Sequence, residues 1–315
     1  MSDILLVSAG DDGSFEEFRA HPPVGDQPRP LGRAVSIEQP GHDLAKLVMN
    51  ACSPRGHFFV RTRQWGCRYA FVLEHPFTHA NDWRWDPDGI LSEAVALSRL
   101  VRDNAYSTQY AARVVEHADG ERQVIPFDGY ESRQAYRLRS DRDWLDETDA
   151  AELTALMVAF DGARELLPAR LARALWRCEH LTRERYVDIA LPAMVAALEG
   201  LIGTSHRQVT KQFVTRVPAL AGELGVTGVS GRFCRRMYEA RSQGFHGADI
   251  DLLRASAQDE SVRKVALLQA VLRAAVRRGI EDPAFRAVFA DEESIRTRWP
   301  VLVRQRYMRW RSTSL

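Results

Sequence analysis

The sequence predicts an α+β protein in which a mixed N-terminal part, residues 1–145, precedes an all-helical part, residues 146–315. Strand-like patterns and turn signals are concentrated before residue 145, whereas apolar residues recur at helical spacing over most of the chain after it. The change falls at Leu145 to Asp149, where acidic residues and a threonine precede a long apolar-periodic run, as at a helix start. We expect two domains, the first acting as a sensor or substrate selector.

Composition indicates a water-soluble protein with a sizeable core. The 315 residues are 45% hydrophobic and 27% charged, and the formal net charge of +1 gives no overall field toward nucleic acid or membranes. No apolar run approaches the ~20 residues that cross a bilayer, and the N-terminus lacks a basic signal-peptide region. The four cysteines show no C-x-x-C spacing. We therefore expect a cytoplasmic protein without membrane contact, metal or cofactor.

Local patterns before residue 145 predict strands bounded by turn signals and one helix. In chain order these are an apolar run at 4–7, a short strand at 34–37, a hairpin of 57–63 with 68–74, a helix at 90–101, and a hairpin of 110–116 with 122–127. They predict one twisted sheet with a helix packed against it.

After residue 145, apolar periodicity predicts a helical bundle. Helices are expected at 147–165, 167–182, 184–203, 207–223, 231–243 and 256–279, with shorter ones at 282–290 and 293–310. Strand signals nearly vanish in this part of the chain.

The strongest candidate for chemistry is the pair Arg241 and His246, spaced R-x4-H. An unbroken helix would hold these side chains about 140° apart. Gly244 is expected to end the helix, because glycine readily adopts the left-handed conformation of helix ends, and so to bring His246 to the side of Arg241. An arginine fork beside an imidazole that titrates near neutrality suits phosphodiester chemistry.

Glu199 lies in the apolar segment 194–202, where an unpaired carboxylate is costly. It therefore requires a cation, and we expect Arg241 to supply it. The alternative is an ordinary core salt bridge with no chemical role.

Three segments together resemble the Apea-like HEPN domain family: residues 188–202, residues 211–220 and residues 237–247, the last containing the R-x4-H motif. The resemblance covers about residues 150–285. It implies a metal-independent endoribonuclease whose Arg241 and His246 are catalytic and whose Glu199 supports them. Ser242 matches the polar residue that usually follows the motif arginine, and Ser242 and Tyr238 are expected to contact the substrate.

The resemblance also implies a homodimer in which both chains line one cleft. In such a site, histidines from two chains would serve as acid and base, while two arginines would hold the phosphate oxygens. It further implies a role in bacterial defence or growth arrest, as a toxin or antiviral ribonuclease with a phage or antitoxin component as partner. The alternative is a non-catalytic HEPN-like dimerisation or adaptor module with a sensing N-terminal domain.

The C-terminal stretch 296–311 interleaves arginines with aromatic residues and contains no acid. That composition suits phosphate contact combined with base stacking, so Arg304 and Arg306 are expected to bind RNA. The alternative is a last helix that leaves its arginines in solvent and packs four apolar or aromatic side chains on the bundle: Trp299, Leu302, Tyr307 and Trp310.

Overall fold

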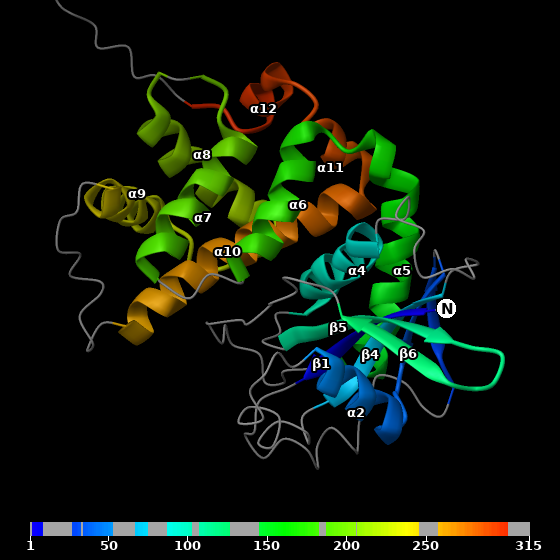
Figure 1. Ribbon diagram of the computed structural model, residues 1–315. Helices are drawn as coiled ribbons and strands as arrows, with labels where there is room; N and C mark the ends of the chain where they lie inside the picture. Colours follow the sequence, from blue (N-terminus) through cyan, green and yellow to red (C-terminus); the bar gives the residue numbers. More distant parts are fainter. Residues whose placement is uncertain are drawn as a thin grey trace, which may run out of the picture.

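The computed structural model describes residues 2–8, 27–32, 34–52, 67–74, 87–102, 107–126, 145–182, 187–205, 207–245 and 258–301. Within them, an antiparallel sheet occupies one end of the molecule and a helical bundle the other (Figure 1). The α+β class predicted from the sequence is confirmed.

The sheet has six strands in the order β2-β3-β4-β1-β5-β6, and every neighbouring pair is antiparallel. The strands are β1 (Ser2–Ser8), β2 (Arg29–Gly32), β3 (Val35–Glu38), β4 (Cys67–Glu74), β5 (Ser107–Glu116) and β6 (Arg122–Pro126). β1 lies in the middle, where Ile4 pairs with Val72 of β4 and with Ala112 of β5. The two outer strands, β2 and β6, are short, and each contains a proline.

One predicted hairpin is confirmed and the other is wrong. β5 and β6 form the second hairpin, and Gly120 adopts a φ of +84° at its turn. β4, in contrast, is paired by β1 on one side and by β3 on the other, so it has no place for the predicted partner 57–63, which lies outside the described residues. The physical reason is that β4 is apolar on both faces, as an interior strand must be, and its partners come from distant segments.

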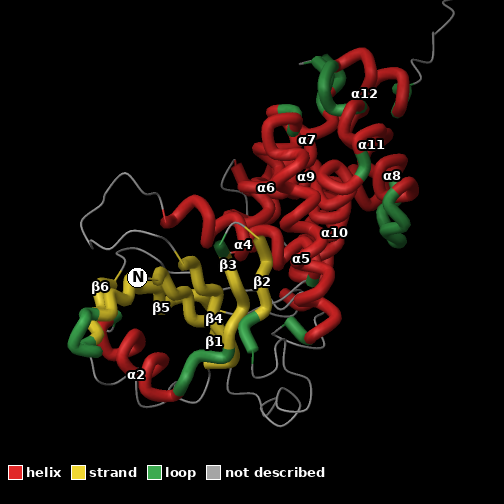
Figure 2. Tube along the Cα trace, turned by 90° about the vertical axis from the view of Figure 1, so that its right-hand side faces the viewer, coloured by secondary structure: helices red, strands yellow, loops and turns green. Residues whose placement is uncertain are grey.

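Helices cover both faces of the sheet. α2 (His42–Ala51) packs on one face, where Val48 and Met49 join a cluster with Ile4 and Leu6 of β1 (Figure 2). α4 (Pro87–Val101), which matches the predicted helix at 90–101, lies against the opposite face. α2 was not predicted from the sequence.

The remaining helices form the bundle and match the predicted helices closely. They are α5 (Glu147–Ala163) with the 3-10 turn η1 (Arg164–Leu166), α6 (Ala169–Thr182), α7 (Val187–Ile202), α8 (Val209–Glu223), α9 (Gly231–Phe245), α10 (Gln258–Glu281), α11 (Pro283–Ala287) and α12 (Glu292–Arg298). The predicted helix at 293–310 is too long: α12 ends at Arg298, two residues before Pro300, because the residue preceding a proline is disfavoured in helical conformation. None of the helices in the described parts of the chain combines the length and hydrophobicity that a membrane crossing requires.

The sheet and the bundle share one hydrophobic core. Phe71 of β4, Leu97 of α4 and Leu272 of α10 belong to the same buried cluster. A buried ion pair reinforces this core: Arg99 of α4 lies 2.7 Å from Glu179 of α6, and both side chains are at most 4% exposed. Figure 1 shows α4 and α5 between the two ends of the molecule. The division into domains at residue 145 stays a prediction.

Candidate functional site

α9 carries the motif arginine and is held against α7 and α8. Its buried face presents Cys234, Met237 and Ala240, each at most 4% exposed. Residues three to four positions apart lie on one side of a helix, so Arg241, four residues after Met237, is directed to that same side. The packing of α9 therefore directs the Arg241 side chain toward the neighbouring helix α7.

Glu199, in the last turn of α7, forms an ion pair with Arg241. The distance from Arg241 Nη1 to Glu199 Oε2 is 2.5 Å, and the side chains are 25% and 14% exposed. The ion pair predicted from the sequence is confirmed. The second carboxylate oxygen, Oε1, is buried and accepts no hydrogen bond from the part of the chain that the structure describes.

Tyr238 supports the guanidinium from the preceding turn of α9. The Arg241 guanidinium carbon lies 5.4 Å from the centroid of the Tyr238 ring, within the range of a cation–π contact. The Tyr238 ring itself packs on Phe213 of α8, with the ring centroids 5.6 Å apart. Residues from α7, α8 and α9 thus fix the arginine side chain in one position.

Arginines cap the end of α7 that carries Glu199. Arg170 donates to the carbonyl oxygens of Gly200 and Gly203, at 3.1 and 2.5 Å, and Arg216 donates to that of Ile202 at 2.9 Å. The last carbonyls of a helix have no intrahelical donor and carry partial negative charge, so cations are favourable there. These contacts hold the backbone on which Glu199 sits.

Arg216 is the most deeply placed of these cations. It also donates to Gln212 and Thr204, and to the carbonyl oxygen of Trp299, within 3.0 Å in each case. Burial, followed by repulsion from Arg296 and Arg170, lowers the pKa of the Arg216 guanidinium from its ordinary value. Its carbonyl and amide partners show that its role here is structural.

The structure corrects the expectation for Gly244. α9 continues through Gly244 and ends at Phe245, so the helix does not break between Arg241 and Gly244 as the sequence suggested. A glycine near a helix end costs only about 1 kcal/mol relative to alanine, which the packing of α9 outweighs. His246 lies outside the described residues, so its predicted position beside Arg241 stays a prediction.

The other predicted contacts divide into two groups. Ser242 is exposed, next to Arg241 on α9, and Tyr238 is half-buried as described above. Arg304 and Arg306 lie outside the described residues. The structure therefore brings together Glu199, Tyr238 and Arg241.

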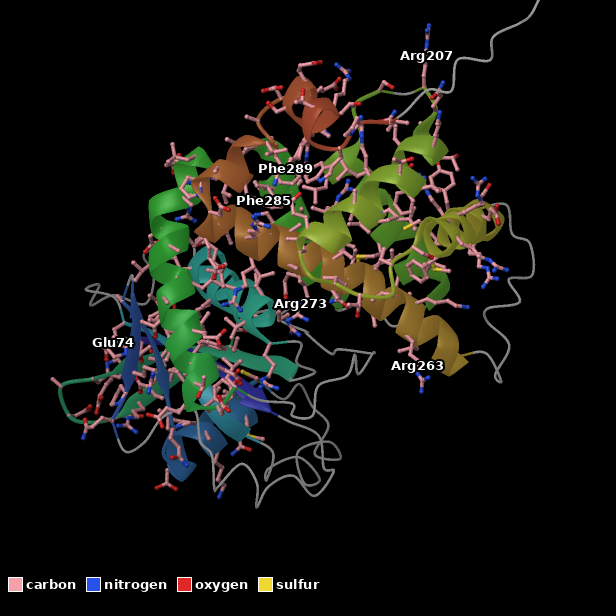
Figure 3. The ribbon with its side chains drawn as sticks, turned by 180° about the vertical axis from the view of Figure 1, so that it is seen from behind. Glu74, Arg207, Arg263, Arg273, Phe285 and Phe289 are labelled. Carbon is pink, nitrogen blue, oxygen red and sulfur yellow. The ribbon has the colours of Figure 1, made fainter. Side chains whose placement is uncertain are left out.

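Trp299, before the arginine-rich C-terminal stretch, packs into the bundle. It is 4% exposed, and its ring lies 5.7 Å from that of Phe289 and 6.4 Å from that of Phe285. Figure 3 labels both phenylalanines at this end of the bundle. For Trp299, the packing alternative for the C-terminal stretch is confirmed.

Sequence reasoning missed a set of exposed arginines on the outer side of the motif helix: Arg232, Arg235 and Arg236. Their i, i+3, i+4 spacing, read together with the helix boundaries, was the signal that could have revealed them.

Two of the cysteines lie in surroundings that disfavour the thiolate. Burial raises the pKa of the Cys234 thiol to about 12 and that of Cys52 to about 11, so neither is a thiolate near neutrality. Within the described ranges, no group of three or more histidine, cysteine, aspartate or glutamate side chains is arranged to hold a metal ion.

Comparison of the chain with protein-family models, with curated proteins and with solved structures finds no match.

Proposed function

We propose that this chain is a metal-independent endoribonuclease of the HEPN type, which acts on RNA as a homodimer. An α+β domain of residues 1–145 would select the substrate or sense a ligand, and a HEPN-like bundle of residues 146–315 would cut. The observation that carries the proposal is the Glu199–Arg241 pair, which joins the two helices that resemble the family's acid-bearing and motif helices.

The geometry suits a phosphate-binding arginine. Arg241 is anchored through one nitrogen by Glu199 and through its face by Tyr238, yet a quarter of its side chain is exposed. A pre-oriented guanidinium stabilises negative charge that develops on a phosphate without reorganising during the reaction. His246 follows five residues later and would move the protons, because an imidazole serves as acid or base near its pKa.

The test is cleavage of a labelled RNA by the full chain with and without EDTA. Arg241→Ala and His246→Ala should each lower the cleavage rate at least about 100-fold, because one acid–base or charge-stabilising group usually contributes that factor to the rate. EDTA should leave the rate unchanged. Matched controls are Arg263→Ala and His180→Ala, which change an exposed arginine on α10 and an exposed histidine on α6. Parental rates in both motif variants would refute the mechanism, as would loss of cleavage on chelation.

Dimerisation is part of the same proposal, because one chain supplies a single motif histidine whereas acid and base act on opposite sides of the scissile phosphate. A twofold axis would place two copies of each residue in one site. Activity per chain should fall on dilution in step with the dimer fraction measured by light scattering. Constant activity per chain in a solution of monomers would exclude a shared site.

A second candidate function, a non-catalytic helical interaction module, is favoured by the engagement of Arg241 within one chain. An arginine already paired with a carboxylate and stacked on a tyrosine is also what a purely structural core pair requires. The two functions predict different behaviour for Arg241→Lys. Lysine keeps the charge but loses the bidentate fork, so a ribonuclease should lose most activity while a module retains its fold and partner.

A further inference from the structure

The outer side of α9 carries three exposed arginines, Arg232, Arg235 and Arg236, which we call the α9 arginine face. Their i, i+3, i+4 spacing places them on one side of the helix. Arg241 lies nine residues after Arg232, about 180° around the helix, and so faces α7 instead. Figure 3 shows nitrogen-bearing side chains projecting from the outer side of α9.

These three arginines differ from the ion-paired arginines of the described residues, because no carboxylate among those residues pairs with them. Elsewhere arginines pair readily with carboxylates, as Arg277 does with Glu152 and Arg298 with Glu223. Across the described residues, Arg232, Arg235 and Arg236 make neither an ion pair nor a side-chain hydrogen bond.

The one acid on the helix does not neutralise the face. Glu239 is exposed four residues after Arg235 and three after Arg236, spacings at which helical ion pairs form. No such pair is present among the described residues, and α9 carries four arginines against this single glutamate. A protein of net charge +1 therefore concentrates unpaired positive charge on one helix face.

We infer that the α9 arginine face binds the phosphate backbone of an RNA strand. Guanidinium groups match phosphate oxygens in geometry and charge, and clustered cations without partners release counterions when a polyanion binds. The three side chains span about 6 Å along the helix axis, enough to contact more than one phosphate. The choice of RNA rests on the proposed function, because this helix also carries Arg241, the arginine of the R-x4-H motif.

In the proposed reaction, the α9 arginine face would position the RNA strand and would take no part in breaking the bond. Phosphate contacts fix the register and orientation of a strand but carry no sequence information. A strand held along the outer side of α9 would be kept close to the C-terminal part of that helix, which carries Arg241. The α9 arginine face would thus set the binding strength for RNA of any sequence.

The test is a binding measurement that is independent of cleavage. Fluorescence anisotropy of a short labelled single-stranded RNA is followed with the full chain carrying His246→Ala, over a series of salt concentrations. The triple change Arg232→Gln, Arg235→Gln and Arg236→Gln should raise the Kd roughly 100-fold at about 0.1 M salt and reduce the slope of log K against log salt by about 2, since each single-strand phosphate contact contributes about 0.7.

Two single variants sharpen the result. Arg263→Gln, which removes an exposed arginine from α10 (Figure 3), should leave both Kd and slope at the parental values. Glu239→Gln removes the only acid of α9 and should tighten binding severalfold. Circular dichroism of the triple variant should match the parent, because all three side chains are exposed.

Three outcomes would overturn the inference: an unchanged Kd and slope in the triple variant, a comparable loss in Arg263→Gln, or displacement of the RNA by polyglutamate at equal charge, which would indicate an acidic protein as partner. Failure of the proposed function gives a different pattern. In that case the parent would not cleave RNA, yet binding would still depend on the α9 arginine face.

Discussion

The two oxygens of the Glu199 carboxylate have different surroundings, and this difference affects the stability of the fold. One oxygen lies 2.5 Å from Arg241, while the other is buried and lacks a hydrogen-bond donor among the described residues. An unsatisfied buried charged oxygen costs free energy, so the single ion pair must offset it. The pair is therefore sensitive to removal of either partner.

Replacing Glu199 should weaken both stability and the proposed activity. Glu199→Ala leaves Arg241 half-buried without its carboxylate and should lower the free energy of unfolding by about 1–3 kcal/mol, less than for a fully buried pair because both side chains retain some exposure. Urea unfolding measures the change. The control Glu239→Ala, at an exposed position on α9, should change stability by no more than about 0.5 kcal/mol. Equal stability of Glu199→Ala and the parent would contradict the ion pair.

At the scale of residues, the sequence predicted that Glu199 needs a cation, but it did not predict the backbone conformation after Arg241 or the contacts that hold α7. An acid among Leu198, Leu201 and Ile202 demanded a cation, and the structure supplies Arg241. The prediction that Gly244 ends the helix was wrong, because the conformational preference of one glycine is weaker than the packing of the rest of α9. The arginine contacts that cap α7 were also not predictable, since Arg170 and Arg216 lie on other helices.

At the scale of elements, α6 and α10 approach closely at a glycine. A Cβ atom built on Gly279 would lie 2.6 Å from Leu171 Cδ1. Glycine is needed there because Leu171 is itself 1% exposed and has little freedom to move.

Gly279→Ala should therefore destabilise the protein, although alanine favours a helix. The clash should cost about 1–3 kcal/mol, partly offset by about 1 kcal/mol of helix propensity. Gly222→Ala, where an added Cβ meets no atom within 4 Å, is the matched control and should not destabilise. Thermal unfolding of the two variants decides between them, and a stabilised Gly279→Ala protein would contradict the close approach.

The end of α8 holds the end of α12 through Glu223. This carboxylate accepts hydrogen bonds from Arg298 at 2.5 Å and from the Trp299 indole at 3.1 Å. The hydrogen bond from Arg298, with smaller contributions from Trp299 and Arg278 and against the effect of burial, lowers the pKa of Glu223 below its ordinary value of 4.5.

A lowered pKa in the folded state means that Glu223 stabilises the fold above about pH 4.5 and that this contribution is lost as pH falls through the folded value. Glu223→Gln should accordingly lower the Tm at pH 7 by roughly 1–2 °C, the shift that a loss near 1 kcal/mol gives in a chain of 315 residues. Below the folded pKa the difference should disappear. A Tm difference that is constant from neutral to acidic pH would show that charge is not involved.

Element prediction succeeded where the signal was local. Apolar periodicity gave the helices from α5 to α10 within a few residues of their ends, because each buries a continuous stripe. The pairing of β4 failed because β1 and β3 lie far from it in sequence, and nothing local specifies a partner at that distance. α2 was missed because the proline- and glycine-rich segment before it suggested irregular structure.

At the scale of the whole molecule, α4 joins the sheet to the bundle through charge as well as through the core. Arg99 pairs with Glu179 of α6, and Arg102 pairs with Asp149 of α5, each at 2.7 Å. Because α4 also packs on the sheet, we expect the sheet and the bundle to unfold together.

Arg99→Met is the perturbation that tests this coupling. It leaves Glu179 buried beside an apolar side chain and should cost about 3–5 kcal/mol, the usual penalty for breaking a buried pair. Hydrogen exchange should accelerate equally in β1 and in α7 if the molecule is one cooperative unit. Exchange that accelerates in only one of them would instead indicate two domains that unfold independently.

The outer strands of the sheet have a consequence for self-association. β2 is covered by α5, with Arg29 paired to Glu147 at 3.3 Å, and Pro30 deprives that strand of a backbone donor. β6 is five residues long and ends at Pro126. An edge of this kind is a poor template for another chain, so the sheet resists extension into a continuous intermolecular ribbon. Association of two copies through these sheet edges is therefore disfavoured, and concentrated solutions should not form the fibrillar aggregates that open sheet edges promote.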